Sequence, residues 1–203
     1  MYFNGYVFNN FQQIPQIKRI FDENIKKVNR KLKLWELDRV SESEFKEQKK
    51  FPIIVILNDI RSLNNIGSFF RTADAFNIEK IYLCGITAKP PHREIQKTAL
   101  GATESVVWEH RDSIIELINE LKDENMLIAS IEQAEKTTFL HQIEQIPNHK
   151  IALVFGNEVD GVDQEVINTS DYIIEIPQFG TKHSLNVSVC AGVVLWEFSK
   201  KYF

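Results

Sequence analysis

The feature of this sequence that most constrains its fold is a series of short apolar runs separated by segments of helical pattern. Residues 53–57 are apolar at every position and mostly β-branched, which is typical of a strand buried on both faces of a parallel sheet. Comparable runs occupy residues 80–84, 105–108, 126–130, 151–155 and 172–176. Helical patterns occupy residues 65–76, 112–122 and 184–201. This alternation predicts an α/β fold with a mostly parallel sheet and helices on both faces.

Residues 1–50 have a different texture from the rest of the chain. Apolar residues at helical spacing between positions 17 and 28 predict one helix, and Ser41 or Ser43 is a suitable N-cap for a second. This segment holds 11 Lys and Arg against 7 Asp and Glu, a local charge of +4, whereas the whole chain carries −4. We expect a basic, helical N-terminal arm over residues 1–50 and a separate domain over residues 51–203. Such an arm is suited to binding a polyanion such as a nucleic acid. A solvent-exposed helix face explains the same excess of lysine equally well.

Several function classes lose support from the composition and motifs. The chain has no G-x-G-x-x-G and no G-x-x-x-x-G-K-[ST] segment, the usual marks of nucleotide-binding folds. Its five histidines lack the pairing of a zinc helix, so no metal site is predicted. Cys84 and Cys190 lie far apart in apolar runs, which is typical of buried thiols in a reducing compartment. With no apolar stretch of membrane-spanning length and no signal-peptide pattern, we expect a cytoplasmic protein with no membrane partner.

Polar residues and glycines follow three of the predicted strands. They occupy residues 58–67, 156–161 and 177–188. Because the carboxyl ends of parallel strands meet at one edge of a sheet, these three loops are expected to form a single site there. His183 followed by Ser184 is compatible with a hydrolase, but the G-x-S-x-G elbow that presents a nucleophilic serine is absent.

The three loops together resemble a known family. The segments NIGSFFRTA at 65–73, GNEVDG at 156–161, and IP at 176–177 followed by SLNVS at 184–188 match, in order and spacing, three motifs of the SpoU/TrmH-type RNA 2′-O-ribose methyltransferases. These enzymes belong to the SPOUT superfamily, and the resemblance extends from about residue 52 to residue 196. Each motif alone is weak, whereas three in order are specific.

The resemblance implies a fold and an activity that periodicity alone does not indicate. It implies a SPOUT-type methyltransferase domain over residues 51–203, with a deep trefoil knot near the C-terminus and a homodimer packed through that knot. The implied reaction is transfer of a methyl group from S-adenosylmethionine, without a metal, to a ribose 2′-hydroxyl in structured RNA. The continuation RTADAF at 71–76 is more similar to tRNA-modifying members, with rRNA as the next candidate. The N-terminal arm is then expected to bind the substrate.

The resemblance also assigns roles to individual residues. The positions implied to hold the cofactor, mainly through main-chain groups, are Ser130, Gly156, Ile176 and Leu185. The positions implied to act in catalysis are Asn65, Arg71, Glu158, Ser184 and Asn186. Arg71 is expected to stabilise the developing alkoxide or an adjacent phosphate, because arginine stays protonated in proteins and is an awkward base, although a base role stays open.

Each of these residues also has a purely structural interpretation. Arg71 can be an exposed helix residue, Asn65 and Ser184 can be helix caps, Gly156 a turn glycine and Glu158 a solvated loop carboxylate. Two functional alternatives also remain. One is a SPOUT enzyme that methylates a base, and the other is a non-catalytic RNA-binding protein that keeps the fold.

Overall fold

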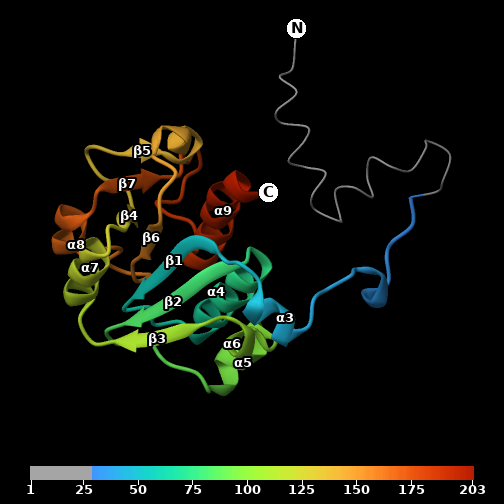
Figure 1. Cartoon of the computed structure of the whole chain (residues 1–203). Coiled ribbons are helices and arrows are strands. Elements are labelled where there is room, and N and C mark those ends of the chain that lie inside the picture. The colour runs from blue at the N-terminus through green and yellow to red at the C-terminus, as the bar shows by residue number, and fades with distance from the viewer. Residues whose placement is uncertain (1–28) are drawn as a thin grey trace, which may run out of the picture.

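A computed structural model describes residues 29–203, which form a seven-stranded sheet covered by helices (Figure 1). The strands are β1 (Phe51–Asn58), β2 (Ile78–Cys84), β3 (Trp108–Arg111), β4 (Leu127–Ile131), β5 (Thr138–Phe139), β6 (Ile151–Phe155) and β7 (Tyr172–Glu175). Their order is β3-β2-β1-β6-β4-β7-β5, and every neighbouring pair is parallel. The predicted α/β class and parallel sheet are confirmed.

Helices pack on both faces of this sheet, as predicted. The helices are α3 (Glu42–Glu47), α4 (Leu63–Ala75), α5 (Arg93–Ala99), α6 (Ala102–Ser105), α7 (Ile114–Asp123), α8 (Gln164–Thr169) and α9 (Val187–Ser199), with 3-10 turns η1 (Leu34–Glu36), η2 (Leu140–Gln145) and η3 (Lys200–Tyr202). On β1, Val55 and Leu57 belong to the core formed with α4 and α9, whereas Ile54 and Ile56 belong to the core formed with α7 and α8. The alternating side chains of one strand therefore fill two separate cores.

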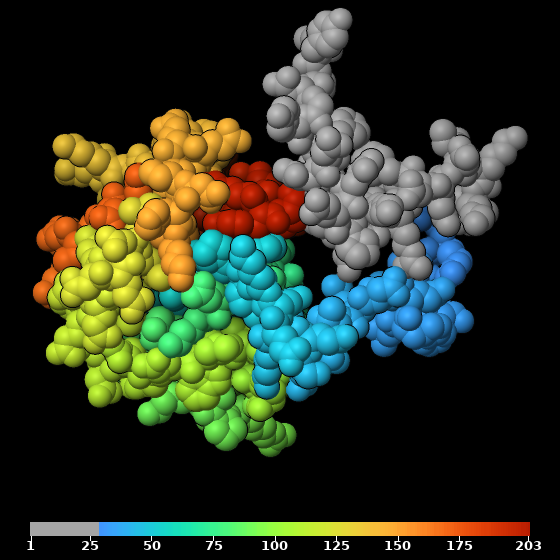
Figure 2. Space-filling model, in the orientation of Figure 1, coloured from blue at the N-terminus to red at the C-terminus, as the bar shows by residue number. Residues whose placement is uncertain are grey.

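The C-terminus of the chain packs against the start of β1 and against η2. Figure 2 shows the red C-terminal residues at the surface, next to the orange segment around η2. The ring of Tyr202 stacks on that of Phe51 with centroids 5.0 Å apart, and the Lys201 ammonium donates to the Ile143 carbonyl at 3.1 Å. These contacts hold the end of α9 against the start of β1.

Most predicted boundaries agree with the structure within two residues, but two elements begin three residues later than predicted. The strand predicted at 105–108 is a helix end followed by a strand start. Helix α6 ends at Ser105, whose hydroxyl donates to Asp74 of α4 at 2.5 Å, and β3 begins only at Trp108. The last helix begins at Val187 rather than at Ser184. Its N-cap is Asn186, whose side-chain oxygen accepts from two amides of the first turn.

Only part of the predicted N-terminal arm falls within the described residues. The helix predicted between positions 17 and 28 lies outside them. The second helix is present as α3, capped by Ser41 as predicted, with Phe45 buried in the main core. Among residues 29–203 no helix has the length and apolar character needed to cross a bilayer. The knot implied by the resemblance stays a prediction.

Candidate active site

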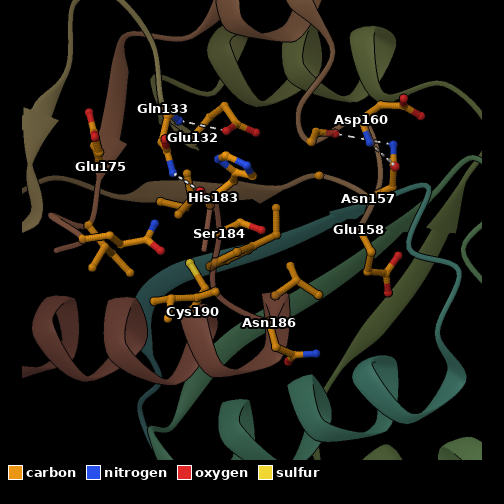
Figure 3. A pocket seen from close by; sticks show the side chains of 18 of the residues that line it. Glu132, Gln133, Asn157, Glu158, Asp160, Glu175, His183, Ser184, Asn186 and Cys190 are labelled. Atoms are coloured by element: carbon orange, nitrogen blue, oxygen red, sulfur yellow. Dashed lines mark hydrogen bonds between the residues drawn. The ribbon is translucent and has the colours of Figure 1, made fainter. Parts of the chain in front are cut away.

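The carboxyl ends of three neighbouring strands surround a cavity of about 480 Å³ (Figure 3). Residues that follow β4, β6 and β7 form its walls, and the start of α9 closes one side. Strands β6 and β4 are paired, and so are β4 and β7, although none of these pairs is consecutive in the chain. The cavity has the position expected for a ligand site of a parallel sheet and a volume typical of small-molecule pockets.

Three of the four residues predicted to hold the cofactor line this cavity. Gly156 comes from the loop after β6, and Ile176 and Leu185 come from the start and the end of the loop between β7 and α9. Ser130 does not line it. That side chain is fully buried, and its hydroxyl lies 2.7 Å from the hydroxyl of Ser170. The end of β4 instead reaches the cavity with the three residues that follow Ser130.

The turn over residues 156–161 folds back on itself. The side-chain oxygen of Asn157 accepts from the amides of Val159 and Asp160 at 2.9 and 2.8 Å, and Asn157 pairs with Gly161 in a two-residue bridge. A Cβ on Gly156 would overlap the backbone of Gly161. Glycine is required at this position because the backbone of the turn itself approaches closely.

A relay of hydrogen bonds connects the first two motifs. The side-chain nitrogen of Asn65 donates to the Glu158 carboxylate at 2.8 Å, and the backbone amides of Arg61 and Ser62 donate to it at 3.2 Å each. Partial burial acts to raise the pKa of Glu158, but these hydrogen bonds outweigh it and hold that pKa below its usual range. Glu158 is therefore a carboxylate that accepts hydrogen bonds and anchors the start of α4.

The third motif joins the same relay. The side-chain oxygen of Asn65 accepts from the Asn186 side-chain nitrogen at 3.2 Å and from the Ser188 hydroxyl at 3.4 Å. Asn186 meanwhile caps α9 through its own side-chain oxygen. Figure 3 shows Glu158 and Asn186 on the same side of the cavity. Asn65 is thus the central member of a chain that ties all three motifs together, and it also lies in the first turn of α4.

Ser184 and Arg71 are not members of this relay. Ser184 lines the cavity with an exposed side chain. Arg71 is exposed and makes no hydrogen bond or ion pair with the residues that the structure describes. Six residues correspond to a rotation of about 600° along a helix, so Arg71 lies on a different face of α4 from Asn65. Within one chain Arg71 therefore presents a free cation to solvent rather than to the cavity.

Sequence reasoning missed several polar residues of the site. The most prominent are Glu132 and Gln133, which follow β4 directly and line the cavity. The rule that identified the other loops, polar residues after an apolar run, applies equally to this one. Ser188 was quoted within the third motif, yet its contact with Asn65 was not expected.

The cavity is rich in carboxylates. Glu132, Glu158, Asp160 and Glu175 all line it, and His183 lies among them. The thiol of Cys190 also faces it, and burial together with the nearby Glu132 raises the pKa of that thiol to about 12. Such a thiol stays protonated at neutral pH and is a poor nucleophile. Among residues 29–203, no group of three His, Cys, Asp or Glu side chains is arranged to hold a metal ion.

Comparison with known proteins identifies relatives of this arrangement. The sequence model of the SpoU rRNA Methylase family matches residues 52–196. The 23S rRNA (guanosine-2′-O-)-methyltransferase RlmB of Neisseria meningitidis is 32% identical over 146 residues, which cover 72% of this chain and 57% of that protein. The crystal structure of an A. aeolicus TrmH/SpoU tRNA modifying enzyme superposes with a TM-score of 0.70 at 25% identity, covering 79% of each chain.

A further structural neighbour was crystallised with a ligand. It is an AdoMet-bound rRNA methyltransferase from Sinorhizobium meliloti, with a TM-score of 0.70 and 23% identity over 76% of this chain and 58% of that one. At this identity the likeness concerns the fold. The chain spans about three fifths of the length of the curated relatives it matches.

Proposed function

This chain belongs to the SpoU rRNA Methylase family, and on that premise we propose that it transfers a methyl group from S-adenosylmethionine to a ribose 2′-hydroxyl of RNA. The observation that carries the proposal is the relay through Asn65, which joins the three motifs at the margin of one cavity. Because the three segments lie far apart in the chain, this convergence is difficult to explain by helix capping alone.

The cavity fits the proposed cofactor in size and chemistry. Its volume is in the range for a ligand of this size, and Gly156, Ile176 and Leu185, the positions proposed to hold the cofactor through main-chain groups, all line it. The surrounding carboxylates suit a molecule that carries a sulfonium and an ammonium group. When bound, S-adenosylmethionine supplies an electrophilic methyl group and leaves as S-adenosylhomocysteine. No metal is required for this displacement.

The polar residues act on the RNA side of the reaction. The ribose hydroxyl would give its proton to solvent water as its oxygen bonds to the methyl carbon, so a positioned cation beside that oxygen stabilises the charge that develops. Arg71 is the proposed cation. Because it faces away from the cavity of its own chain, it acts at the cavity of a second copy, on the alkoxide or on the adjacent phosphate. Asn65 orients the nucleotide from its fixed position, Glu158 holds Asn65, and Ser184 and Asn186 offer hydrogen bonds at the cavity margin.

The proposed assembly is a homodimer. Helix α9 is apolar on nearly every side, and Val189, Val193 and Trp196 form a stripe at helical spacing whose side chains are 55%, 42% and 49% exposed. A second copy would remove this stripe from water. Sedimentation at micromolar concentration should give twice the chain mass, and a monomer at that concentration would refute the dimer.

Among the RNA substrates, tRNA is proposed first and rRNA second, and the proposed location is the cytoplasm. The test is transfer of labelled methyl from S-adenosylmethionine to total tRNA and to rRNA, followed by nucleoside analysis. A 2′-O-methylated nucleoside supports the proposal and names the target. A methylated base would instead indicate a base-methylating SPOUT enzyme. If no methyl is incorporated into either RNA and the protein does not bind the cofactor, the non-catalytic RNA-binding alternative is favoured.

A further inference from the structure

The two residues that follow β4 contact both loops that form the cavity. One carboxylate oxygen of Glu132 accepts from the Val162 amide at 3.0 Å, immediately after the turn over residues 156–161. The side-chain nitrogen of Gln133 donates to the His183 carbonyl at 2.9 Å, immediately before Ser184 (Figure 3). The same short segment is thus bonded to the loop after β6 and to the loop after β7.

The two contacts are coupled to each other. The second carboxylate oxygen of Glu132 accepts from the backbone amide of Gln133 at 2.8 Å, which fixes the direction in which the Gln133 side chain leaves the strand. Gly161 has a positive φ of 71°, and a Cβ there would collide with the Glu132 carboxylate. The carboxylate therefore packs directly against the turn, and both of its oxygens are occupied by backbone amides.

We propose that Glu132 and Gln133 are positioning residues that set the separation of the two cavity loops and thereby the affinity for the cofactor. The inference rests on the proposed function, because it concerns the same cavity. Main-chain groups bind a ligand only where the backbone positions them. Here the side chains of Glu132 and Gln133 position the backbone of the two cavity loops. Hydrogen bonds to a charged group are stronger than neutral ones, so Glu132 carries the larger share.

The variants follow from this chemistry. Glu132→Gln keeps the shape of the side chain but turns one acceptor into a donor that faces a backbone amide. Gln133→Ala removes the bond to the His183 carbonyl from an exposed side chain, so the fold does not depend on it. Glu124→Gln is the matched control, because Glu124 is an exposed residue at the end of α7, outside the cavity.

The experiment measures S-adenosylmethionine binding by titration calorimetry, and the Michaelis constants for S-adenosylmethionine and for tRNA. We expect Glu132→Gln to weaken cofactor binding about tenfold and Gln133→Ala about threefold, as loss of one charged and one neutral hydrogen bond predicts. The KM for tRNA and the kcat at saturating cofactor should stay within about twofold of the unsubstituted protein. A purely structural role would lower the melting temperature without this selective change in cofactor affinity.

The outcomes separate this inference from the proposed function. If the unsubstituted protein binds the cofactor and both variants bind it equally well, the positioning role is overturned while the proposed function stands. An equal rise in the KM for tRNA would also overturn the positioning role, because the defect would then extend beyond the cavity. If the unsubstituted protein neither binds the cofactor nor transfers methyl, both proposals fall together.

Discussion

The side-chain nitrogen of Asn65 donates a hydrogen bond of 2.8 Å to the Glu158 carboxylate, across 93 residues of sequence. This contact fixes the orientation of the Asn65 amide, because a carboxylate only accepts and the amide must turn its nitrogen toward it. Its oxygen then faces the Asn186 nitrogen and the Ser188 hydroxyl, both of which are able to donate. Glu158, the ionised member of the relay, therefore determines which atoms of the other relay side chains donate and which accept.

Asn65→Asp should disable the site without changing its shape. The substitution removes the donor to Glu158 and sets two carboxylates against each other in a side chain that is only 8% exposed. We expect the free energy of unfolding to fall by about 1–3 kcal/mol and methyl transfer to fall at least about a hundredfold. Urea unfolding and initial rates measure the two effects.

The matched control for Asn65→Asp is Asn168→Asp on α8. The Asn168 side-chain oxygen accepts from Gln164, and an aspartate accepts the same bond. The control should keep both its stability and its activity. Equal activity of Asn65→Asp and Asn168→Asp would contradict the proposed role of the relay.

Arg71→Ala should abolish methyl transfer while leaving cofactor affinity unchanged. Arg71 lies outside the cavity and makes no hydrogen bond or ion pair with the described residues, so its removal disturbs neither the binding walls nor the fold. Stability should change by less than about 0.5 kcal/mol. Rate assays measure methyl transfer, and calorimetry measures the affinity for S-adenosylmethionine. Lys122→Ala on α7 is the control in both measurements. A large loss of cofactor binding would show that Arg71 has a different role.

The parts of the fold that the sequence predicts well are those governed by local pattern. The run at residues 151–155 became a strand with those bounds, because a short, wholly apolar segment suits a central strand that is buried on both faces of a sheet. The prediction of a strand over residues 105–108 was wrong. The hydroxyl of Ser105 donates to Asp74, and no local pattern reveals a partner 31 positions away.

The candidate site was predictable to a similar extent. The motifs placed Asn65, Glu158 and Asn186 in one site, and the structure joins them by hydrogen bonds. The motifs did not indicate that Ser130 turns toward Ser170, nor that Glu132 reaches the cavity, because these outcomes depend on which residue at the end of β4 points past the sheet edge.

Glu158 should make the stability of the protein depend on pH in the acid range. Its folded pKa lies below the ordinary value of 4.5, so its contribution is fully present above that value and is lost as the pH falls through the folded pKa. We expect the unsubstituted protein to be more stable than Glu158→Gln at pH 7, and the difference to shrink steadily below about pH 4.5. Urea unfolding at pH values between 7 and 3.5 tests this. A difference that is constant with pH would mean that the carboxylate charge contributes nothing.

Gly156→Ala should open the turn that forms one wall of the cavity. Its new Cβ would overlap the backbone of Gly161, and because the neighbour is backbone rather than a flexible side chain, the turn itself must move. Overpacking of this kind costs about 1–3 kcal/mol of stability, and the displaced main-chain groups should bind S-adenosylmethionine more weakly. Gly180→Ala is the control, since that glycine is exposed and a Cβ there meets nothing within 4 Å. If Gly156→Ala melts at the same temperature as Gly180→Ala, the turn does not need its glycine. If it also binds the cofactor equally well, the close approach of the two backbone segments does not determine the shape of the cavity.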